Sequence, residues 1–297
     1  MKVFLILLMV SCTQIKPLER KEQPATPAPP AFNYQLKNVD IYNGKVKFIQ
    51  FATDKADGVA EILCDTPKKE KKRKFRGQVK NRVFRFYFAE SYFSDPYLAK
   101  CFFEGQHVLN VNVREYNYPR ESLNVPKRKV DLNKKDLERV LKEMEVKKTL
   151  YQDSADHFLF LTPFKIPLKS KITSYYGNQR IFNDKKKSQH LGNDLRAGVG
   201  VKIPATNRGR VSFVGDFFFS GKLVIIDHGL DIYTVYMHLS KILVKPGDIV
   251  AAGDIVALAG RTGRVSGPHL HWGVKINDSW VDGFTLVEES KKHFVLE

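Results

Sequence analysis

The sequence predicts a mainly β protein in which a helix connects two β domains. Three observations lead to this prediction. Short alternating segments such as "NRVFRFYFA" recur between residues 33 and 126, a helical stripe occurs between residues 127 and 150, and strand segments separated by glycine fill residues 151–297. With 297 residues, of which 43% are apolar, the chain is long enough to form two hydrophobic cores.

The first twelve residues indicate export. "MKVFLILLMVSC" has one lysine and then an apolar run from Val3 to Val10, which is too short to span a bilayer. Its end resembles the lipobox of bacterial lipoproteins, in which the cysteine, here Cys12, becomes lipidated. We therefore expect residues 1–12 to be a lipoprotein-type signal peptide. For such a lipoprotein, Thr13 after the cysteine indicates the periplasmic side of the outer membrane. The alternative to a lipoprotein signal is an ordinary secretory signal peptide.

The net charge of the chain indicates which classes of binding partner to expect. The chain has 49 Lys and Arg against 32 Asp and Glu, a net charge of +17, which favours contact with polyanions. Since the sequence contains no recognisable nucleic-acid-binding module, we expect no nucleic-acid partner. The proline-rich residues 13–32 read as an extended tether. The basic run "KKEKKRKFR" at 68–76 is either an anion-binding patch or a solvated loop, and we favour the loop.

Residues 33–126 predict a small, sandwich-like β domain. Alternation places Phe84, Phe86 and Phe88 on one strand face, which suits a core, and leaves a mixed face for partial solvation. If Cys12 is lipidated, Cys64 and Cys101 form an even pair in an oxidising compartment. We expect them to form a disulfide, with two buried thiols as the alternative.

Residues 127–150 predict a linker and an amphipathic helix. Four apolar residues follow one another at helical spacing, and Asn133 is the expected N-cap, with Asp136 in the first turn. The stripe consists of Leu137, Val140, Leu141 and Met144. We interpret this helix as a structural connector.

Three segments of residues 151–297 carry candidate chemistry. "QHLGNDL" places His190 and Asp194 four residues apart, with Gly192 allowing the backbone to bend between them. "IYTVYMHLS" places His238 on the polar face of a strand, and "GPHLHW" places His269 and His271 on one strand face. A catalytic zinc site needs three protein ligands, such as histidine or aspartate, and one open position for water. The four histidines and one aspartate of these segments are more than one such site requires.

The absence of glutamate is also informative. Residues 151–287 contain none, whereas zinc peptidases of the HExxH kind use glutamate as their base. Proton transfer must then fall to histidine or to an aspartate that is not a ligand, and histidine is the simpler choice.

Together these motifs resemble the lysostaphin/LytM-type zinc metallopeptidases, which cut peptide cross-links of bacterial cell walls. The resemblance runs from about Ile172 to Gly283 and rests on "ITSYYGNQR", "HLGND", "YTVYMHLS" and the segment that ends in "GPHLHWGV". It implies a compact β barrel or sandwich for residues 151–297 and Zn²⁺ as the cofactor. By position, it implies metal ligands at His190, Asp194 and His271, and two catalytic histidines that are not ligands, His238 and His269.

The expected function is therefore that of a zinc-dependent endopeptidase acting on the peptide cross-links of peptidoglycan. For an outer-membrane lipoprotein, the D-alanyl–diaminopimelate bond is the first expectation. Peptidoglycan and, through the lipid on Cys12, the outer membrane are the expected partners. The alternative is a non-catalytic lipoprotein that binds the cell wall and regulates other wall hydrolases. The complete set of ligand positions favours the enzyme.

Overall fold

The structure is a computed structural model, and it describes residues 32–67, 71–123, 127, 131–183 and 186–294. Strands dominate these residues, and helices occur at α1 (Lys134–Thr149) and α2 (Gly283–His293). The predicted mainly β class is confirmed. The expected signal peptide with Cys12 and nearly all of the expected tether lie outside the described residues. In the described part of the chain, no helix is long and apolar enough to cross a membrane.

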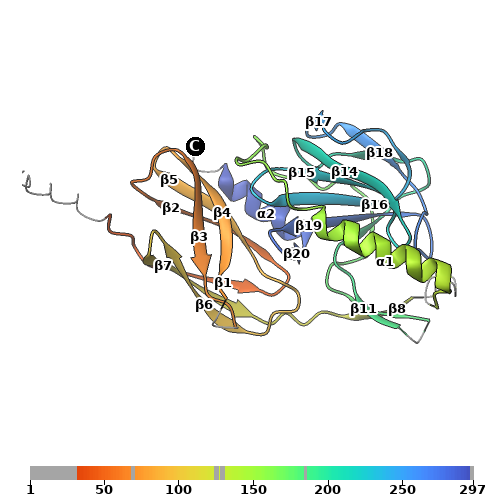
Figure 1. Ribbon diagram of the computed structural model, residues 1–297, viewed down its shortest axis with the longest axis horizontal. Helices are drawn as coiled ribbons and strands as arrows, with labels where there is room; N and C mark the ends of the chain where they lie inside the picture. The colour runs from red at the N-terminus through yellow and green to blue at the C-terminus, as the bar shows by residue number, and fades with distance from the viewer. Residues whose placement is uncertain (1–31, 68–70, 124–126, 128–130, 184–185, 295–297) are drawn as a thin grey trace, which may run out of the picture. The chain divides into compact units, whose positions relative to one another are not determined.

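The first part of the chain folds into a seven-stranded sheet (Figure 1). Its strand order is β1-β7-β6-β3-β4-β5-β2, in which β1 and β7 are parallel and the other neighbours are antiparallel. The strands are β1 (Lys37–Tyr42), β2 (Val46–Ala52), β3 (Gly58–Cys64), β4 (Arg73–Lys80), β5 (Val83–Ala89), β6 (Tyr97–Phe103) and β7 (Gln106–Arg114).

This sheet encloses a core rich in phenylalanine. Phe84, Phe86 and Phe88 all point into it and are almost completely buried, as their alternation on β5 predicts. Residues from both end strands, β1 and β2, reach the same core, so the sheet must curl around it. Cys64 and Cys101 lie opposite each other on β3 and β6 and are joined by a disulfide.

The second face of β5 is partly solvated at Val83 and Arg85, as expected, but not at Tyr87. Tyr87 is only 3% exposed, its hydroxyl is hydrogen-bonded to Nδ1 of His293 on α2 at 3.2 Å, and the His293 ring stacks on Phe48 with centroids 4.9 Å apart. This face joins the core of the C-terminal region, which α2 helps to cover. Alternation shows which residues share a strand face, but it does not show what covers that face.

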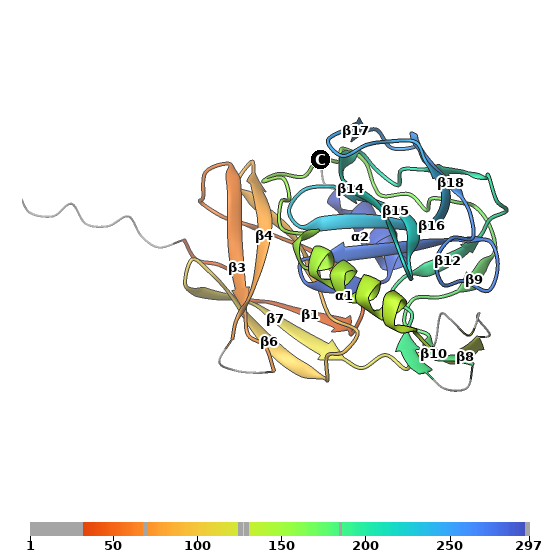
Figure 2. The same ribbon diagram turned by 45° about the vertical axis from the view of Figure 1, so that its right-hand side comes forward.

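Two further sheets follow in the chain (Figure 2). The smaller one has the order β11-β10-β8, with β8 parallel to β10, and the larger one has the main path β17-β14-β15-β16-β19-β12-β9, to which β13, β18 and β20 are attached. Their strands are β8 (Arg120–Leu123), β9 (Ile172–Ser174), β10 (Gln179–Phe182), β11 (Lys186–Gln189), β12 (Asn193–Arg196), β13 (Lys202–Pro204), β14 (Gly209–Phe217), β15 (Gly221–Asp227), β16 (Ile232–Ile242), β17 (Ile249–Val250), β18 (Ile255–Ala259), β19 (His269–Ile276) and β20 (Ser279–Val281).

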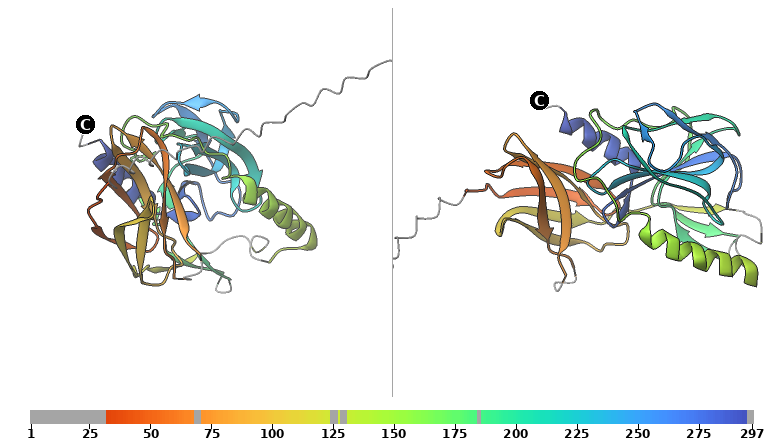
Figure 3. Two further views of the ribbon diagram at one scale, coloured as in Figure 1. Left: turned by 60° about the vertical axis from the view of Figure 1, so that its left-hand side comes forward. Right: turned by 45° about the horizontal axis from the view of Figure 1, so that its top comes forward.

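Helix α1 packs through its polar side. Asn133 caps it as predicted, since its side chain accepts a hydrogen bond from the Asp136 N–H at 2.8 Å. The apolar stripe, however, does not face a core, because Leu137, Leu141 and Met144 are each about half exposed. The helix is held instead by Glu143, whose carboxylate accepts the buried Phe218 N–H at 2.9 Å. Figure 3 shows α1 at the periphery, with strands on one side of it only.

The basic run is divided between a loop and a strand. Residues 68–70 lie outside the described part, Lys71 and Lys72 precede β4, and the remainder of the run begins β4. Arg73 pairs with Glu90 at 3.0 Å, and Arg76 pairs with Asp231 at 3.4 Å. Through the pair of Arg76 with Asp231, the part of the run that lies in β4 connects the first sheet to the C-terminal region. The interpretation of the run as a solvated loop did not predict this contact.

Candidate metal centre

Three side chains from separate segments converge where β12 and β19 pair. Asp194 on β12 lies directly opposite His271 on β19, and His190 follows the end of β11. Nδ1 of His271 and Nε2 of His190 lie 2.8 and 2.9 Å from Oδ1 of Asp194, and 3.0 Å from each other. All three residues are buried. Gly192 is needed between the first two, because a Cβ there would collide with the His271 ring.

The donor set fits a zinc ion. Two imidazole nitrogens and one carboxylate oxygen, all within 4.8 Å of one another, form a common ligand set of catalytic zinc, which leaves a fourth position for water. Burial by itself raises the pKa of Asp194, but the charges and hydrogen bonds of His190 and His271 outweigh it and hold this pKa well below its ordinary value. Burial lowers the pKa of His271 to about 4. An ionised carboxylate and a neutral imidazole are the forms that bind metal.

The orientation of the His190 ring is fixed by hydrogen-bond partners of Nδ1, the ring nitrogen that does not face Asp194. Its Nδ1 donates to the Tyr175 carbonyl oxygen at 2.8 Å, and the Ser174 hydroxyl lies 3.0 Å from the same nitrogen. With the proton on Nδ1, Nε2 is left with a free lone pair that faces Asp194. A carbonyl partner on the far nitrogen is the usual way in which proteins orient a histidine ligand.

His238 reaches this centre by a route that the sequence did not predict. Alternation along β16 placed it on the face of Tyr236. Instead, His238 has a φ of 63° and the pairing of β15 with β16 shifts register beside it. Leu239 therefore joins Tyr236 in the core, whereas His238 turns to the cleft beside Asp194.

His238 and His269 lie side by side, with ring centroids 4.9 Å apart. Nδ1 of His238 donates to the Thr262 carbonyl oxygen at 2.8 Å, and Nδ1 of His269 donates to that of Gly267 at 2.9 Å. In each neutral ring, Nε2 is therefore the basic nitrogen. Burial, reinforced by the charges of His269 and His271, lowers the pKa of His238 well below its ordinary value. Such rings can accept a proton from water or deliver one to a leaving group.

A glutamate also belongs to the centre. Glu121 on β8 accepts hydrogen bonds from Ser174 at 2.8 Å, from Asn178 at 2.9 Å and from Arg180, and Arg180 in turn donates to Oδ2 of Asp194. Burial by itself raises the pKa of Glu121, but these hydrogen bonds outweigh it and lower the pKa. The absence of glutamate from residues 151–287 did not exclude one here, because β8 pairs with β10 from outside that range. The sequence prediction missed Glu121 and gave no role to Arg180 or Ser174.

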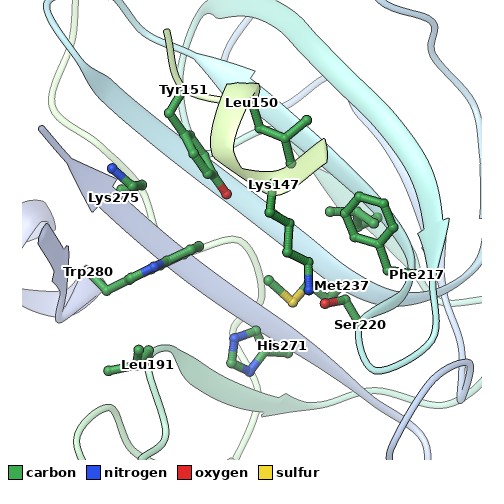
Figure 4. Close-up of a pocket in the computed structure, with 11 residues that line it drawn as sticks. Lys147, Leu150, Tyr151, Leu191, Phe217, Ser220, Met237, His271, Lys275 and Trp280 are labelled. Carbon is green, nitrogen blue, oxygen red and sulfur yellow. The ribbon is translucent and has the colours of Figure 1, made fainter. Parts of the chain in front are cut away.

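Residues of the centre line two separate hollows. A cleft of about 120 Å³ is lined by Glu121, Asp194, His238 and His269, among others. A second pocket, of about 390 Å³, is lined by His271 together with residues of the sheet and of the C-terminal end of α1 (Figure 4). Both hollows could therefore hold parts of a substrate that reaches the centre.

The other histidines of the described region lie apart from this centre. His228 is buried and hydrogen-bonded to the Arg208 carbonyl and to Thr234, so it is a core residue. His293 packs under the first sheet, His107 is bonded to Asn110, and His157 is exposed. Of the two tryptophans, Trp272 lies in the core and Trp280 lines the larger of the two pockets.

Residues 188–283 match the family described as Peptidase family M23, and this stretch contains the three converging residues and both neighbouring histidines. The chain contains an M23 peptidase domain. It is 39% identical over 108 residues to the peptidoglycan DD-endopeptidase ShyB of Vibrio cholerae, a match that covers 34% of this chain and 25% of that protein. It is 36% identical over 110 residues to ShyA, a peptidoglycan DD-endopeptidase of the same organism, covering 37% and 26%. The chain thus spans about a quarter of the length of these relatives.

The fold likeness extends beyond the M23 domain. A crystal structure described as an M23 peptidase from Pseudomonas aeruginosa matches with a TM-score of 0.60 and 23% identity, covering 84% of this chain and 95% of that one. Because this coverage is far larger than residues 188–283, the match must include much of what precedes the M23 domain. The combination of β strands in front of an M23 domain is therefore a fold that another protein shares.

Proposed function

We propose that this protein is a zinc-dependent endopeptidase that hydrolyses peptide cross-links of bacterial peptidoglycan. The observation that carries the proposal is the convergence of His190, Asp194 and His271 within an M23 domain, with His238 and His269 beside them. The relatives named as peptidoglycan DD-endopeptidases support the substrate class.

In this proposal His190, Asp194 and His271 hold the zinc. Bound there, zinc would supply Lewis acidity that activates water and polarises the scissile carbonyl. His238 and His269 would manage the protons: Nε2 of one accepts a proton from the attacking water and, once protonated, passes it to the departing amine nitrogen, while the other stabilises the tetrahedral species. Because Nδ1 of each ring donates to a carbonyl oxygen, Nε2 of the neutral base is free to accept that proton, and Nε2 of the other ring can donate a hydrogen bond when that ring is protonated.

The bond that we propose is the D-alanyl–diaminopimelate cross-link, on the periplasmic side of the outer membrane. The support for the location is the sequence "MKVFLILLMVSC", with Cys12 as the lipidated residue. Cell fractionation tests this part: the wild-type protein should sediment with outer membranes, and a Cys12→Ser protein should be released from them. A Cys12→Ser protein that stays in the outer membrane would refute anchoring through this residue.

Metal analysis combined with digestion of purified sacculi tests the enzymatic proposal. The wild-type protein should contain about one zinc per chain and release soluble muropeptides, and a chelator should stop the release until zinc is restored. His271→Ala should lose both zinc and activity, whereas His269→Ala should keep zinc and lose turnover. His157→Ala, which removes an exposed histidine, is the matched control and should behave as wild type. A fully active His269→Ala protein, or wild-type activity without zinc, would contradict the assignment.

A further inference from the structure

The ammonium group of Lys147 faces the pocket beside His271. Lys147 extends from the last turn of α1 toward Met237 and Ser220, and His271 lies beneath them (Figure 4). Among the described residues, no hydrogen bond or ion pair to Nζ of Lys147 is found, and the group lies 5.0 Å from the centroid of the Phe217 ring. Glu143, one turn earlier on the helix, is occupied by Arg139 and by the Phe218 N–H.

The rest of the pocket lining is mostly apolar, and its formally charged side chains are all positive. Its lining includes Leu223, Met237 and Trp280, with Lys147 and Lys275 as its charged side chains and no carboxylate among the described lining residues. Burial lowers the pKa of Lys147, and the nearby Glu143 only partly opposes this effect. A half-buried ammonium without an acceptor is unfavourable, and a ligand carboxylate would supply the missing partner.

We propose that Lys147 is a specificity-determining residue that binds a free carboxylate of the substrate, on the carbon that bears the scissile amide nitrogen. This inference rests on the proposed function, because it treats the pocket beside His271 as part of the substrate groove. In a D-alanyl–diaminopimelate cross-link, the carbon bonded to the scissile nitrogen carries a carboxylate. That carboxylate lies within one residue of the bond that is cut. Lys147 lines the same pocket as His271, a proposed metal ligand, so its ammonium group is also close to the place of cleavage. The alkyl chain of diaminopimelate suits the apolar walls.

Lys147 lies outside residues 188–283, on a helix that precedes the M23 domain. The specificity of the domain is therefore set in part by a residue from elsewhere in the chain. Its neighbour Lys148 provides a matched control, because it is exposed on the same turn and pairs with Glu145 at 2.7 Å on the solvent side.

The test uses two cross-linked muropeptide dimers that differ only in this carboxylate, which is free in one and amidated in the other. The zinc-loaded full chain is assayed as wild type, Lys147→Met and Lys148→Met, after equal zinc content and similar thermal unfolding have been established. Wild type and Lys148→Met should prefer the free acid in kcat/KM by about 10- to 100-fold, the range expected for a charge-assisted hydrogen bond. Lys147→Met should cut both dimers at about the wild-type rate for the amide.

A Lys147→Met protein that keeps the preference for the free acid would overturn the inference. If wild type cuts neither dimer, the proposed function fails, and calorimetric binding of the same two dimers then decides the carboxylate site separately. Tighter binding of the free acid by wild type, lost in Lys147→Met, would support the site. Equal binding of both dimers by wild type would overturn it.

Discussion

At the scale of single residues, Glu121 connects the proposed metal ligands to the rest of the chain. Its carboxylate bonds Ser174, which contacts His190, and Arg180, which donates to Asp194. Partners of this kind hold ligands in position and usually change metal affinity about 10- to 100-fold when removed. Glu121→Gln should therefore weaken zinc binding by about that factor, as measured by competition with a chromogenic chelator.

Glu115→Gln is the control for this substitution. Glu115 precedes β8 and is exposed, so neutralising it changes the net charge equally without touching the centre. Its zinc affinity should match wild type. Equal zinc affinity in the Glu121→Gln protein would mean that Glu121 only holds β8 against β10.

The same residues show what could be predicted at this scale. His190, Asp194, His238, His269 and His271 belong to short motifs, and the structure brings all five together. Glu121 lies 53 positions before Ser174 and belongs to no motif that includes it. Its place depends on the parallel pairing of β8 with β10, a non-local contact that local patterns do not encode.

At the scale of elements, helix α1 is attached through its polar side and not through its apolar stripe, which an amphipathic pattern would have predicted to face the core. Because Glu143 accepts a buried N–H of Phe218, Glu143→Ala removes the hydrogen bond between them and should lower the free energy of unfolding by about 1–3 kcal/mol. Leu141→Gln, on the half-exposed stripe, should change it by less than about 0.5 kcal/mol. Urea denaturation measures both, and a larger loss for Leu141→Gln would show that the stripe is covered in solution.

Helix α2 makes the stability of the protein depend on pH. Burial, with the charges of Arg85 and Lys80, lowers the pKa of His293 to about 4, against about 6.5 for histidine in an unfolded chain. Between these values the unfolded chain binds a proton that the folded chain does not, so stability rises with pH and is lost as pH falls from 6.5 toward 4. One such group contributes about 2–3 kcal/mol between pH 7 and 4.5.

Urea unfolding of wild type and His293→Phe at pH 7 and 4.5 isolates this contribution. Phenylalanine keeps the stacking on Phe48 and does not titrate, so the variant should lose less stability on acidification. His228 and His271, whose pKa values burial also lowers to about 4, act in the same direction in both proteins and cancel in the comparison. An equal loss in both proteins would exclude His293 as a source of the pH dependence.

At the scale of the whole molecule, the mainly β class was predictable and the association of the sheets was not. Strand periodicity and glycine punctuation identify β structure segment by segment. The second face of β5 is different: Tyr87 shares its core with residues of the M23 domain, and nothing in "NRVFRFYFA" specifies that partner. Ion pairs such as Lys45 with Asp282, at 2.8 Å, join residues 237 positions apart, beyond the reach of any local pattern.

This shared core predicts that the sheets unfold together. Both tryptophans of the chain, Trp272 and Trp280, lie in the M23 domain, so their fluorescence reports on that domain alone. Phe75 is fully buried in the separate core of the first sheet, and Phe75→Ala should cost about 3–5 kcal/mol there. If the sheets are coupled, the substitution should lower the midpoint of the tryptophan transition as much as that of far-UV circular dichroism. A tryptophan transition that stays at the wild-type midpoint would show that the M23 domain is stable without the first sheet.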